Sequence, residues 1–235
     1  MSESRHGSNR NLLILGVTSS LAPSIIRSAR GRGYNIYGTY RNRSNVSPDF
    51  EDLVTLLELD ISSEASISSF DGFIQTTQFD AVVSLIGKTF IEKNMSEKSA
   101  SVILYLNSYI TNLICLFDKI IASLENTQKK SSFTYVSSRA AIYGSFDPYY
   151  AATKSALQAY VTSVSNKYPQ ITFHLIISGL IEESTMFLEM DLVNVKNHRL
   201  RAENQLAHIN DFGNFLFSAI ESEKSELIHW FGKNY

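Results

Sequence analysis

Short runs of apolar residues alternate along the chain with longer amphipathic stretches. The short runs are rich in Val, Ile, Leu and Phe and are bounded by Gly, Asn, Asp or Ser, which is typical of buried strands. Strands are predicted over residues 11–16, 35–40, 54–60, 80–87, 132–137, 172–177 and 226–231. Helices are predicted between them, over residues 23–32, 64–76, 97–124, 149–167 and 202–221.

This alternation predicts the fold class. Near-continuous apolar strands are buried on both faces, and parallel strands need helical crossovers between them. We therefore expect an α/β protein with a doubly wound, mostly parallel seven-stranded sheet and helices on both faces. Residues 1–10 are predicted to form a flexible polar tail and residues 11–235 a single domain.

Composition is that of an ordinary globular domain: 235 residues, 44% hydrophobic, 19% charged, with a net charge of −2. The 21 basic residues are scattered, so no nucleic-acid partner is expected. No apolar run was expected to reach the ~18 residues of a membrane span, and residues 12–17 are too short for a secretory signal. These features predict a cytoplasmic protein without a membrane partner.

Cysteine and histidine suggest neither a disulfide nor a metal centre. The single cysteine, Cys115, lies in an apolar helical pattern, so a buried thiol is expected. His174 and His208 have no partner at the spacing of metal ligands, so no metal is expected.

A group of polar residues with catalytic potential follows the fifth predicted strand. This strand ends in Ser137 and Ser138, and the next helix carries Tyr150 and Lys154 four residues apart, hence about 6 Å apart on one face. A cation stabilises a phenolate, so Lys154 is expected to lower the pKa of Tyr150. Chance alone gives roughly 0.6 such Tyr-Lys pairs in this composition, and a surface helix would look the same. The order of the surrounding elements therefore carries the argument.

The first turn has features of an anion site. Ligands of doubly wound sheets lie beyond the carboxyl ends of the strands, where the topology reverses. Gly16 permits a tight bend there, and the helix that follows offers N–H groups and a positive dipole end to a pyrophosphate. The small residues expected to let the backbone approach that pyrophosphate are Thr18, Ser19, Ser20 and Ala22, and Leu21 is expected to bind the cofactor as well. The alternative is an ordinary helix cap with first-turn residues.

Taken in order, these features resemble the short-chain dehydrogenase/reductase family over about residues 11–231. The family's glycine turn maps onto residues 15–22 with only Gly16 kept, and its strand-four motif onto residues 84–87 with only Gly87 kept. The resemblance implies a Rossmann-fold NAD(P)-binding domain whose catalytic residues are intact and whose cofactor motifs are eroded.

The resemblance also implies roles for four residues. Tyr150 would donate the proton, Lys154 would bind the nicotinamide ribose, and Asn107 would anchor a proton-relaying water. A serine would hold the carbonyl oxygen. The family's spacing selects Ser137, whereas the strand alignment selects Ser138. We prefer Ser138, because a one-residue slip in a buried strand turns every side chain to the other face.

Further cofactor contacts are implied by the same alignment. Asp60 would read the adenine amino group, with Ile61 beside it, and the backbone of Ile181 would meet the nicotinamide carboxamide. The second strand ends with Arg41 and Arg43 and has no acid until Asp49, which favours NADP(H) over NAD(H). Arg41 is the expected phosphate ligand with Arg43 in support; the alternative is a pair of solvated loop charges.

The leading functional hypothesis is an NADPH-dependent carbonyl reductase, or an alcohol dehydrogenase in reverse, acting on a small carbonyl or alcohol substrate. The alternatives are a sugar-nucleotide epimerase or dehydratase, and a non-catalytic nucleotide-binding Rossmann module. The first alternative is weakened by the expectation that such enzymes carry a further carboxy-terminal substrate domain.

Two features bear on substrate and assembly. Residues 182–200 are apolar-rich and are expected to form a substrate lid, with a core helix as the alternative. Aromatic residues between the serines and the tyrosine suggest a flat substrate: Tyr143, Phe146 and Tyr149. Helices 97–124 and 149–167 have apolar residues on more than one face and pair across a twofold axis in the family, which predicts a homodimer or homotetramer.

Overall fold

The computed structural model describes residues 10–90, 98–127, 129–145, 147–184, 207–222 and 226–232. Seven strands form one sheet in the order β3-β2-β1-β4-β5-β6-β9, and all neighbouring pairs are parallel. They are β1 (Arg10–Leu15), β2 (Tyr34–Tyr40), β3 (Thr55–Glu58), β4 (Ala81–Ser84), β5 (Ser131–Ser138), β6 (Ile171–Ser178) and β9 (Ile228–Phe231). The predicted doubly wound α/β fold is confirmed, and its topology reverses between β1 and β4.

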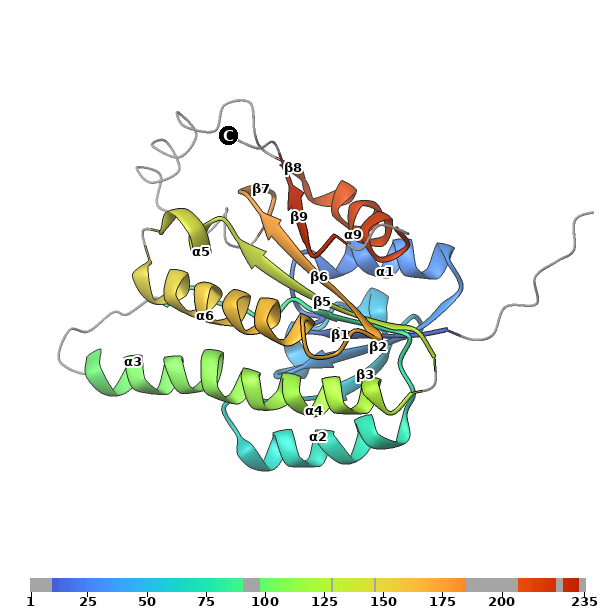
Figure 1. Ribbon diagram of the computed structural model, residues 1–235, viewed down its shortest axis with the longest axis horizontal. Helices are drawn as coiled ribbons and strands as arrows, with labels where there is room; N and C mark the ends of the chain where they lie inside the picture. The colour runs from blue at the N-terminus through green and yellow to red at the C-terminus, as the bar shows by residue number, and fades with distance from the viewer. Residues whose placement is uncertain are drawn as a thin grey trace, which may run out of the picture.

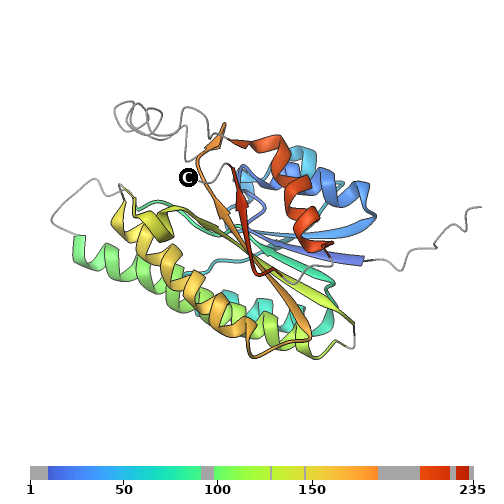
Figure 2. The same cartoon turned by 45° about the horizontal axis from the view of Figure 1, so that its top comes forward.

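Helices cover both faces of the sheet. One layer is α1 (Ala22–Gly31) and α9 (Phe212–Ile220); the other contains α2 (Glu64–Thr76), α3 (Lys98–Leu106), α4 (Leu113–Glu125) and α6 (Pro148–Ser165). Figures 1 and 2 show the two layers on opposite sides of the twisted sheet. A short helix, α5 (Ala140–Tyr143), and a two-stranded sheet of β7 (Ile181–Glu182) and β8 (Ala207–His208) lie near the carboxyl ends of β5 and β6.

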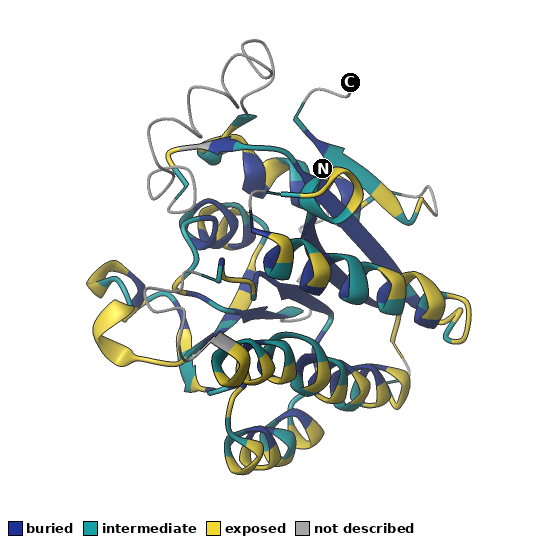
Figure 3. Ribbon diagram, turned by 90° about the vertical axis from the view of Figure 1, so that its left-hand side faces the viewer, coloured by how far each residue is buried: buried dark blue, intermediate teal, exposed yellow. Residues whose placement is uncertain are grey.

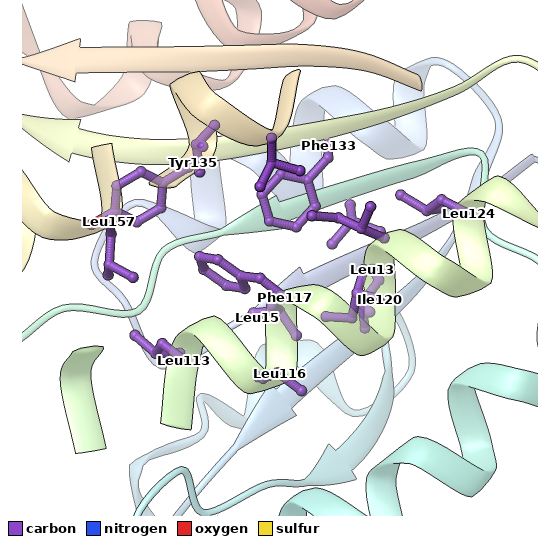
Figure 4. Packing of buried hydrophobic residues seen from close by; sticks show 14 of the residues in the cluster. Leu13, Leu15, Leu113, Leu116, Phe117, Ile120, Leu124, Phe133, Tyr135 and Leu157 are labelled. Atoms are coloured by element: carbon purple, nitrogen blue, oxygen red, sulfur yellow. The ribbon is translucent and has the colours of Figure 1, made fainter. Parts of the chain in front are cut away.

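Each layer closes its own hydrophobic core. On one face, Leu113, Phe117 and Ile120 of α4 pack against Leu13 of β1 and Phe133 of β5 (Figure 4). On the other face, α1 and α9 cover Leu12, Ile14 and Val83. The strand residues alternate between these cores, as expected for a sheet buried on both sides. The sheet is therefore a rigid platform for the loops at its carboxyl edge.

The helix predicted over residues 97–124 is divided by a π-helical turn at Asn107–Asn112, designated η4. Its stretch Ser99–Glu125 is long and apolar enough to cross a membrane by length and composition, with a mean hydropathy of 1.6, and 28% of that window is buried. The expectation that no such stretch exists was therefore wrong. The inner side of α4 packs on the sheet, as a core helix would, while the exposed side is visible in Figure 3. Cys115 lies on that exposed side, which contradicts the predicted buried thiol.

Three differences from the predicted elements have a local cause. Arg10 belongs to β1 and donates to the carbonyl of Arg32, so the strand begins inside the predicted tail. The segment 207–211 forms β8 and a 3₁₀ turn, so the last helix begins only at Phe212. Helix α5 was not predicted, because four residues are too few for a periodic pattern.

The contact between α1 and α9 depends on a glycine. The Gly213 N–H donates to Ser24 Oγ at 2.8 Å, and a Cβ on Gly213 would lie 2.1 Å from the Ser24 carbonyl oxygen. Backbone atoms cannot move aside as a flexible side chain can. Gly72 in α2 has open space around the same position.

We expect Gly213→Ala to lower the free energy of unfolding by about 1–3 kcal/mol, because the two helices must separate to admit the methyl group. Gly72→Ala is the matched control and should raise that free energy by up to about 1 kcal/mol, since alanine favours a helix. Urea denaturation of both variants measures the difference. Equal stabilities for the two variants would contradict the packing described here.

Candidate active site

A cleft of about 480 Å³ opens at the carboxyl edge of the sheet, on both sides of the β1–β4 reversal. Most of the residues predicted from the sequence to be catalytic or to bind the cofactor line this cleft, whereas Asp60, Asn107 and Arg43 do not. Those that line it are Gly16, Thr18, Ser19, Ser20, Leu21, Arg41, Ile61, Gly87, Ser138, Tyr150, Lys154 and Ile181. Elements far apart in the sequence therefore converge on one cavity.

The turn after β1 is held by the end of β2. Gly16 has a φ of +91°, a conformation that L-residues rarely adopt. Its N–H donates to Thr39 Oγ1 at 2.9 Å, and the Val17 N–H donates to the Thr39 carbonyl oxygen at 2.8 Å. Helix α1 then begins without a side-chain cap and without an acid in its first turn. Its positive dipole end is thus available to an anion in the cleft.

The charge of the cleft is one-sided. Arg41, Lys88 and Lys154 line it, and none of its lining residues in the described part of the chain is acidic. Arg43, expected to support Arg41, instead pairs with Glu51 at 2.6 Å and does not line the cleft. That expectation was wrong, because an anion partner eight residues along the chain holds Arg43 elsewhere.

Ser138 lies beside Tyr150, and the hydrogen-bonding interaction between their side chains lowers the pKa of Tyr150. Ser138 ends β5, and its Oγ also accepts from the Ala140 N–H at 3.2 Å. The neighbouring Ser137 donates instead to Gln158 Oε1 at 3.1 Å. Of the two serines that the sequence offered, Ser138 is the one that contacts Tyr150.

Lys154 lies one helical turn beyond Tyr150 and is buried. Its Nζ donates to the Val136 carbonyl oxygen at 2.9 Å and to the Ile86 carbonyl oxygen at 3.4 Å. A Cβ on Gly87 would lie 2.6 Å from this Nζ and 2.8 Å from Cε, so a side chain there would require the ammonium to shift from its present position. Gly87 therefore has a steric function in addition to opening the cleft.

The electrostatic relation between Tyr150 and Lys154 differs from the prediction. Burial raises the pKa of Tyr150 to about 12, against the opposing effect of the Ser138 hydrogen bond, and the charge of Asp147 raises it further. Burial lowers the pKa of Lys154 to about 7. Lys154 Nζ lies 5.8 Å from the centre of the Tyr150 ring and bonds to carbonyls. The prediction that Lys154 lowers the pKa of Tyr150 is therefore wrong for this arrangement. Desolvation of the phenol dominates the pKa of Tyr150 instead.

Asn107 is exposed, and its neighbour Ser108 is buried. The cause is η4, in which i→i+5 hydrogen bonds insert an extra residue and rotate the side chains that follow. Tyr109 lines the cleft from this turn, and Asn112 Nδ2 donates to the Ile61 carbonyl oxygen at 2.7 Å. An α-helical register cannot anticipate this rotation, so the structure does not bring Asn107 into the catalytic group.

Asp60 also lies outside the cleft lining. Its Oδ1 accepts from the N–H of Ser62 at 2.9 Å and from the hydroxyl of Ser62 at 2.7 Å. The carboxylate therefore closes a local turn, a common use of Asp after a strand. Ile61 is the residue from this pair that lines the cleft.

Sequence reasoning missed several residues that line the cleft at strand ends. They are Thr39, Tyr40, Asn42, Asn45, Leu85, Ile86, Lys88, Thr89, Tyr109, Val136, Ser178, Gly179, Leu180 and Ser184. Most lie within a few residues of a predicted one, so a rule that selects the whole loop after each strand would have found them. Tyr109 had no such signal.

The aromatic residues expected to contact a flat substrate do not line the cleft where they are described. Tyr143 is exposed, and Tyr149 packs edge-on against Phe90 with 5.1 Å between ring centres. Phe146 and most of the predicted lid, residues 185–200, lie outside the described residues.

Within the described ranges, no group of three or more His, Cys, Asp or Glu side chains could hold a metal ion. His174, for which the sequence offered no partner, is buried beside His229, with 3.1 Å between Nδ1 and Nε2. Burial, and to a lesser degree His229, lowers the pKa of His174 to about 4. His174 therefore stays neutral near pH 7, and its contact with His229 joins β6 to β9.

Comparison with known proteins agrees with this geometry. The family model "NAD dependent epimerase/dehydratase family" matches residues 12–180, which is more than half of the chain. The protein thus belongs to this family, which is related to the short-chain dehydrogenases/reductases, as the resemblance implied. The sequence has no significant match among curated proteins.

Many solved structures share the fold. A short-chain dehydrogenase from Sphingobium yanoikuyae in complex with NADPH matches with a TM-score of 0.76 and 13% identity, covering 94% of this chain and 87% of that one. A short-chain dehydrogenase from Streptomyces avermitilis matches with a TM-score of 0.77 and 18% identity, covering 99% and 89%. At such identities the likeness shows the fold alone.

The lowered pKa of Lys154 predicts a pH dependence of stability. The unfolded chain keeps this lysine protonated up to about pH 10.5, whereas the folded protein releases the proton from about pH 7. The unfolded state therefore binds more protons between these values, and stability rises with pH by up to about 1.4 kcal/mol per unit from this group. We expect this rise to be missing in Lys154→Met.

Urea denaturation from pH 7 to pH 10 measures this difference. Lys130→Met, at an exposed lysine, is the control and should run parallel to the wild type. Parallel curves for wild type and Lys154→Met would show that the amine is not desolvated as the structure indicates.

Proposed function

We propose that the protein is an NADP(H)-dependent oxidoreductase that reduces a carbonyl compound or oxidises the corresponding alcohol. The observation that supports this most is the convergence of Ser138, Tyr150 and Lys154 in an acid-free cleft at the switch point of the sheet. Family membership supports a nicotinamide cofactor. The turn at Gly16 and the backbone at Gly87 and Ile181 would hold this cofactor.

The catalytic roles follow from protonation states. A nicotinamide cofactor supplies or accepts the hydride when it is bound. Tyr150, with a pKa of about 12, is protonated near neutrality and is therefore suited to donate a proton to a carbonyl oxygen. Ser138 lines the cleft beside that phenol and would stabilise the developing charge on the same oxygen. Lys154, with a pKa of about 7, would contribute a positive charge at the same end of the cleft when it is protonated, below about pH 7.

The preference for NADP(H) rests on Arg41. It lines the cleft near the end of β2, where a ribose 2′-phosphate would be recognised. Its guanidinium has no ion-pair partner among the described residues, whereas Arg43 is paired with Glu51. An arginine fork suits a phosphate, and among the described residues no acid lines the cleft to favour an unsubstituted ribose.

The description of the matching family favours a second candidate, a sugar-nucleotide epimerase or dehydratase. Such chemistry would use Tyr150 and Lys154 in the same site. It differs in its outcome, because the nicotinamide cofactor is regenerated within each turnover and no net reduction is seen. Consumption of NADPH with a carbonyl substrate therefore separates the two candidates.

We expect NADPH to bind more tightly than NADH, and Arg41→Ala to remove this preference by weakening NADPH binding about 10-fold or more. Fluorescence titration measures both affinities. Arg43→Ala is a matched control, since it removes an arginine two residues away that is already neutralised by Glu51. Equal effects of the two substitutions, or tighter NADH binding, would contradict the assignment.

Turnover is tested with Tyr150→Phe, which removes only the phenolic oxygen. We expect the rate of NADPH oxidation with an accepted carbonyl compound to fall by about 10²–10⁴-fold, the usual contribution of a general acid. Nucleotide affinity should change little. Full activity in this variant would exclude Tyr150 as the proton donor. Failure of the wild type to bind NADPH or NADH would contradict the proposal of a nicotinamide-dependent enzyme.

A second copy of the chain is proposed as a partner. Helix α3 exposes Ile103 and Leu104 by 60% and 61%, more than their apolar character favours in water. Light scattering should give a dimer or tetramer mass, and Ile103→Glu should lower it. Ile228→Glu, at an exposed position on β9, is the control. A monomer mass for the wild type would refute the proposal.

A further inference from the structure

Asp147 is a buried carboxylate at the start of the catalytic helix, with 4% of its surface exposed. It is the N-cap of α6, and its Oδ1 accepts from the N–H groups of Tyr149 and Tyr150, both at 3.0 Å. Its Oδ2 accepts from the N–H of Phe90 at 2.5 Å. One side chain therefore joins the backbone of Tyr150 to a segment 57 residues away in the sequence.

The segment that Asp147 reaches is one wall of the cleft. Gly87, Lys88 and Thr89 line the cavity, and Phe90 follows them directly. The same segment is held from α3, where the Tyr105 hydroxyl donates to the Lys88 carbonyl oxygen. The Phe90 ring packs against Tyr105 and Tyr149 with 5.1 Å between ring centres in both contacts. The wall is thus tied to two helices.

This wall lies close to Tyr150 and Lys154. Gly87 approaches Lys154 so closely that a Cβ would lie 2.6 Å from Nζ, and 3.9 Å from Cε2 of Tyr150. A small shift of the wall would therefore either press on the ammonium or withdraw the carbonyl of Ile86 that binds it. The distance between wall and helix must be set by a contact between them.

A carboxylate is the side chain that can set this distance. An N-cap needs one acceptor oxygen, which Ser63 supplies for α2 with an Oγ that accepts from Ser66 at 3.2 Å. Asp147 has a second oxygen, and that oxygen goes to the wall. Three N–H donors and the helix dipole compensate the cost of burying its charge. A cap alone does not explain the choice of a buried acid.

We infer that Asp147 is a positioning residue that fixes Tyr150 of α6 relative to the Gly87–Phe90 wall of the cleft. The inference rests on the proposed function for its effect on catalysis, but not for the contact itself. It makes the rate depend on a residue that touches neither substrate nor cofactor. Displacements of about 1 Å in an active site lower rates by about 10²-fold.

Asp147→Asn separates the two tasks of the side chain. The amide oxygen can still cap α6, whereas the amide nitrogen is a donor and cannot accept from Phe90. We expect hydrogen exchange at the Phe90 amide to accelerate at least about 10-fold, while the Tyr149 and Tyr150 amides stay within about 3-fold of wild type. Asp147→Ser is a second variant, since serine is a good cap that is too short to reach the wall.

Kinetics give the second measurement. With a carbonyl substrate that the wild type accepts, we expect kcat to fall about 10–100-fold in both Asp147 variants, with the affinity for NADPH unchanged within about 3-fold. Ser63→Ala is the matched control, because it removes an N-cap whose hydrogen bond involves neither α6 nor the Gly87–Phe90 wall. It should accelerate exchange at Ser66 and leave kcat unchanged.

The pH profile gives a readout that a purely structural role would not move. The titratable groups around Tyr150 are Asp147 and Lys154 on its own helix, Tyr135 on β5 and Tyr105 on α3. The charge of Asp147 raises the pKa of Tyr150. Asp147→Asn and Asp147→Ser remove that charge, so the limb of the pH–rate profile due to Tyr150 should shift to lower pH in both.

The outcomes are distinguishable. Unchanged exchange at Phe90 in both Asp147 variants overturns the inference, and so does accelerated exchange with wild-type kcat and pH profile. If the wild type reduces no carbonyl compound, the reductase proposal fails, and the exchange at Phe90 still decides whether Asp147 holds the wall. Accelerated exchange at Phe90 with a lowered kcat and intact NADPH binding supports it.

Discussion

The burial of Lys154 is the constraint on which the rest of the site depends. Its ammonium bonds to carbonyls at the ends of β4 and β5, and so locks α6 against the carboxyl edge of the sheet. A buried amine is costly unless its donors are satisfied, so both carbonyls must stay where they are. Gly87 fits this arrangement, since a side chain there would displace the amine from these carbonyls. Tyr150 is then placed by the helix itself, one turn earlier.

The cleft is built from small residues and backbone more than from charged side chains. In the turn after β1, Gly16, Thr18 and Ser19 stand where the resemblance to the short-chain dehydrogenases/reductases implies a fuller glycine pattern. The Thr39 side chain fixes this turn by accepting from the Gly16 N–H. Serine and alanine in a turn still allow backbone to approach a phosphate closely. Loss of two glycines therefore alters the surface of the turn without removing the helix terminus that attracts an anion.

The fold and most of the cleft could be predicted because both follow from periodicity. Parallel strands place their carboxyl ends at one edge, so choosing residues after each strand found Gly16, Arg41 and Ser138 without a structure. What failed depended on local geometry that leaves no periodic trace. The extra residue in η4 turned Asn107 outward, and Ser62 captured the Asp60 carboxylate. The predicted direction of the Tyr150 pKa shift was wrong for a third reason, since the depth of burial that raises this pKa is a property of the packed molecule.

The π-helical turn at Asn107–Asn112 has a consequence for how such a protein can diverge. It lies between a half-helix whose register is set by the sheet core and another whose register is set by the wall of the cleft. The extra residue uncouples these two registers, so substitutions on the α3 side need no repacking beneath α4. The α3 half, which holds the cleft wall through Tyr105, can therefore change its contacts with that wall while the core contacts of α4 stay unchanged.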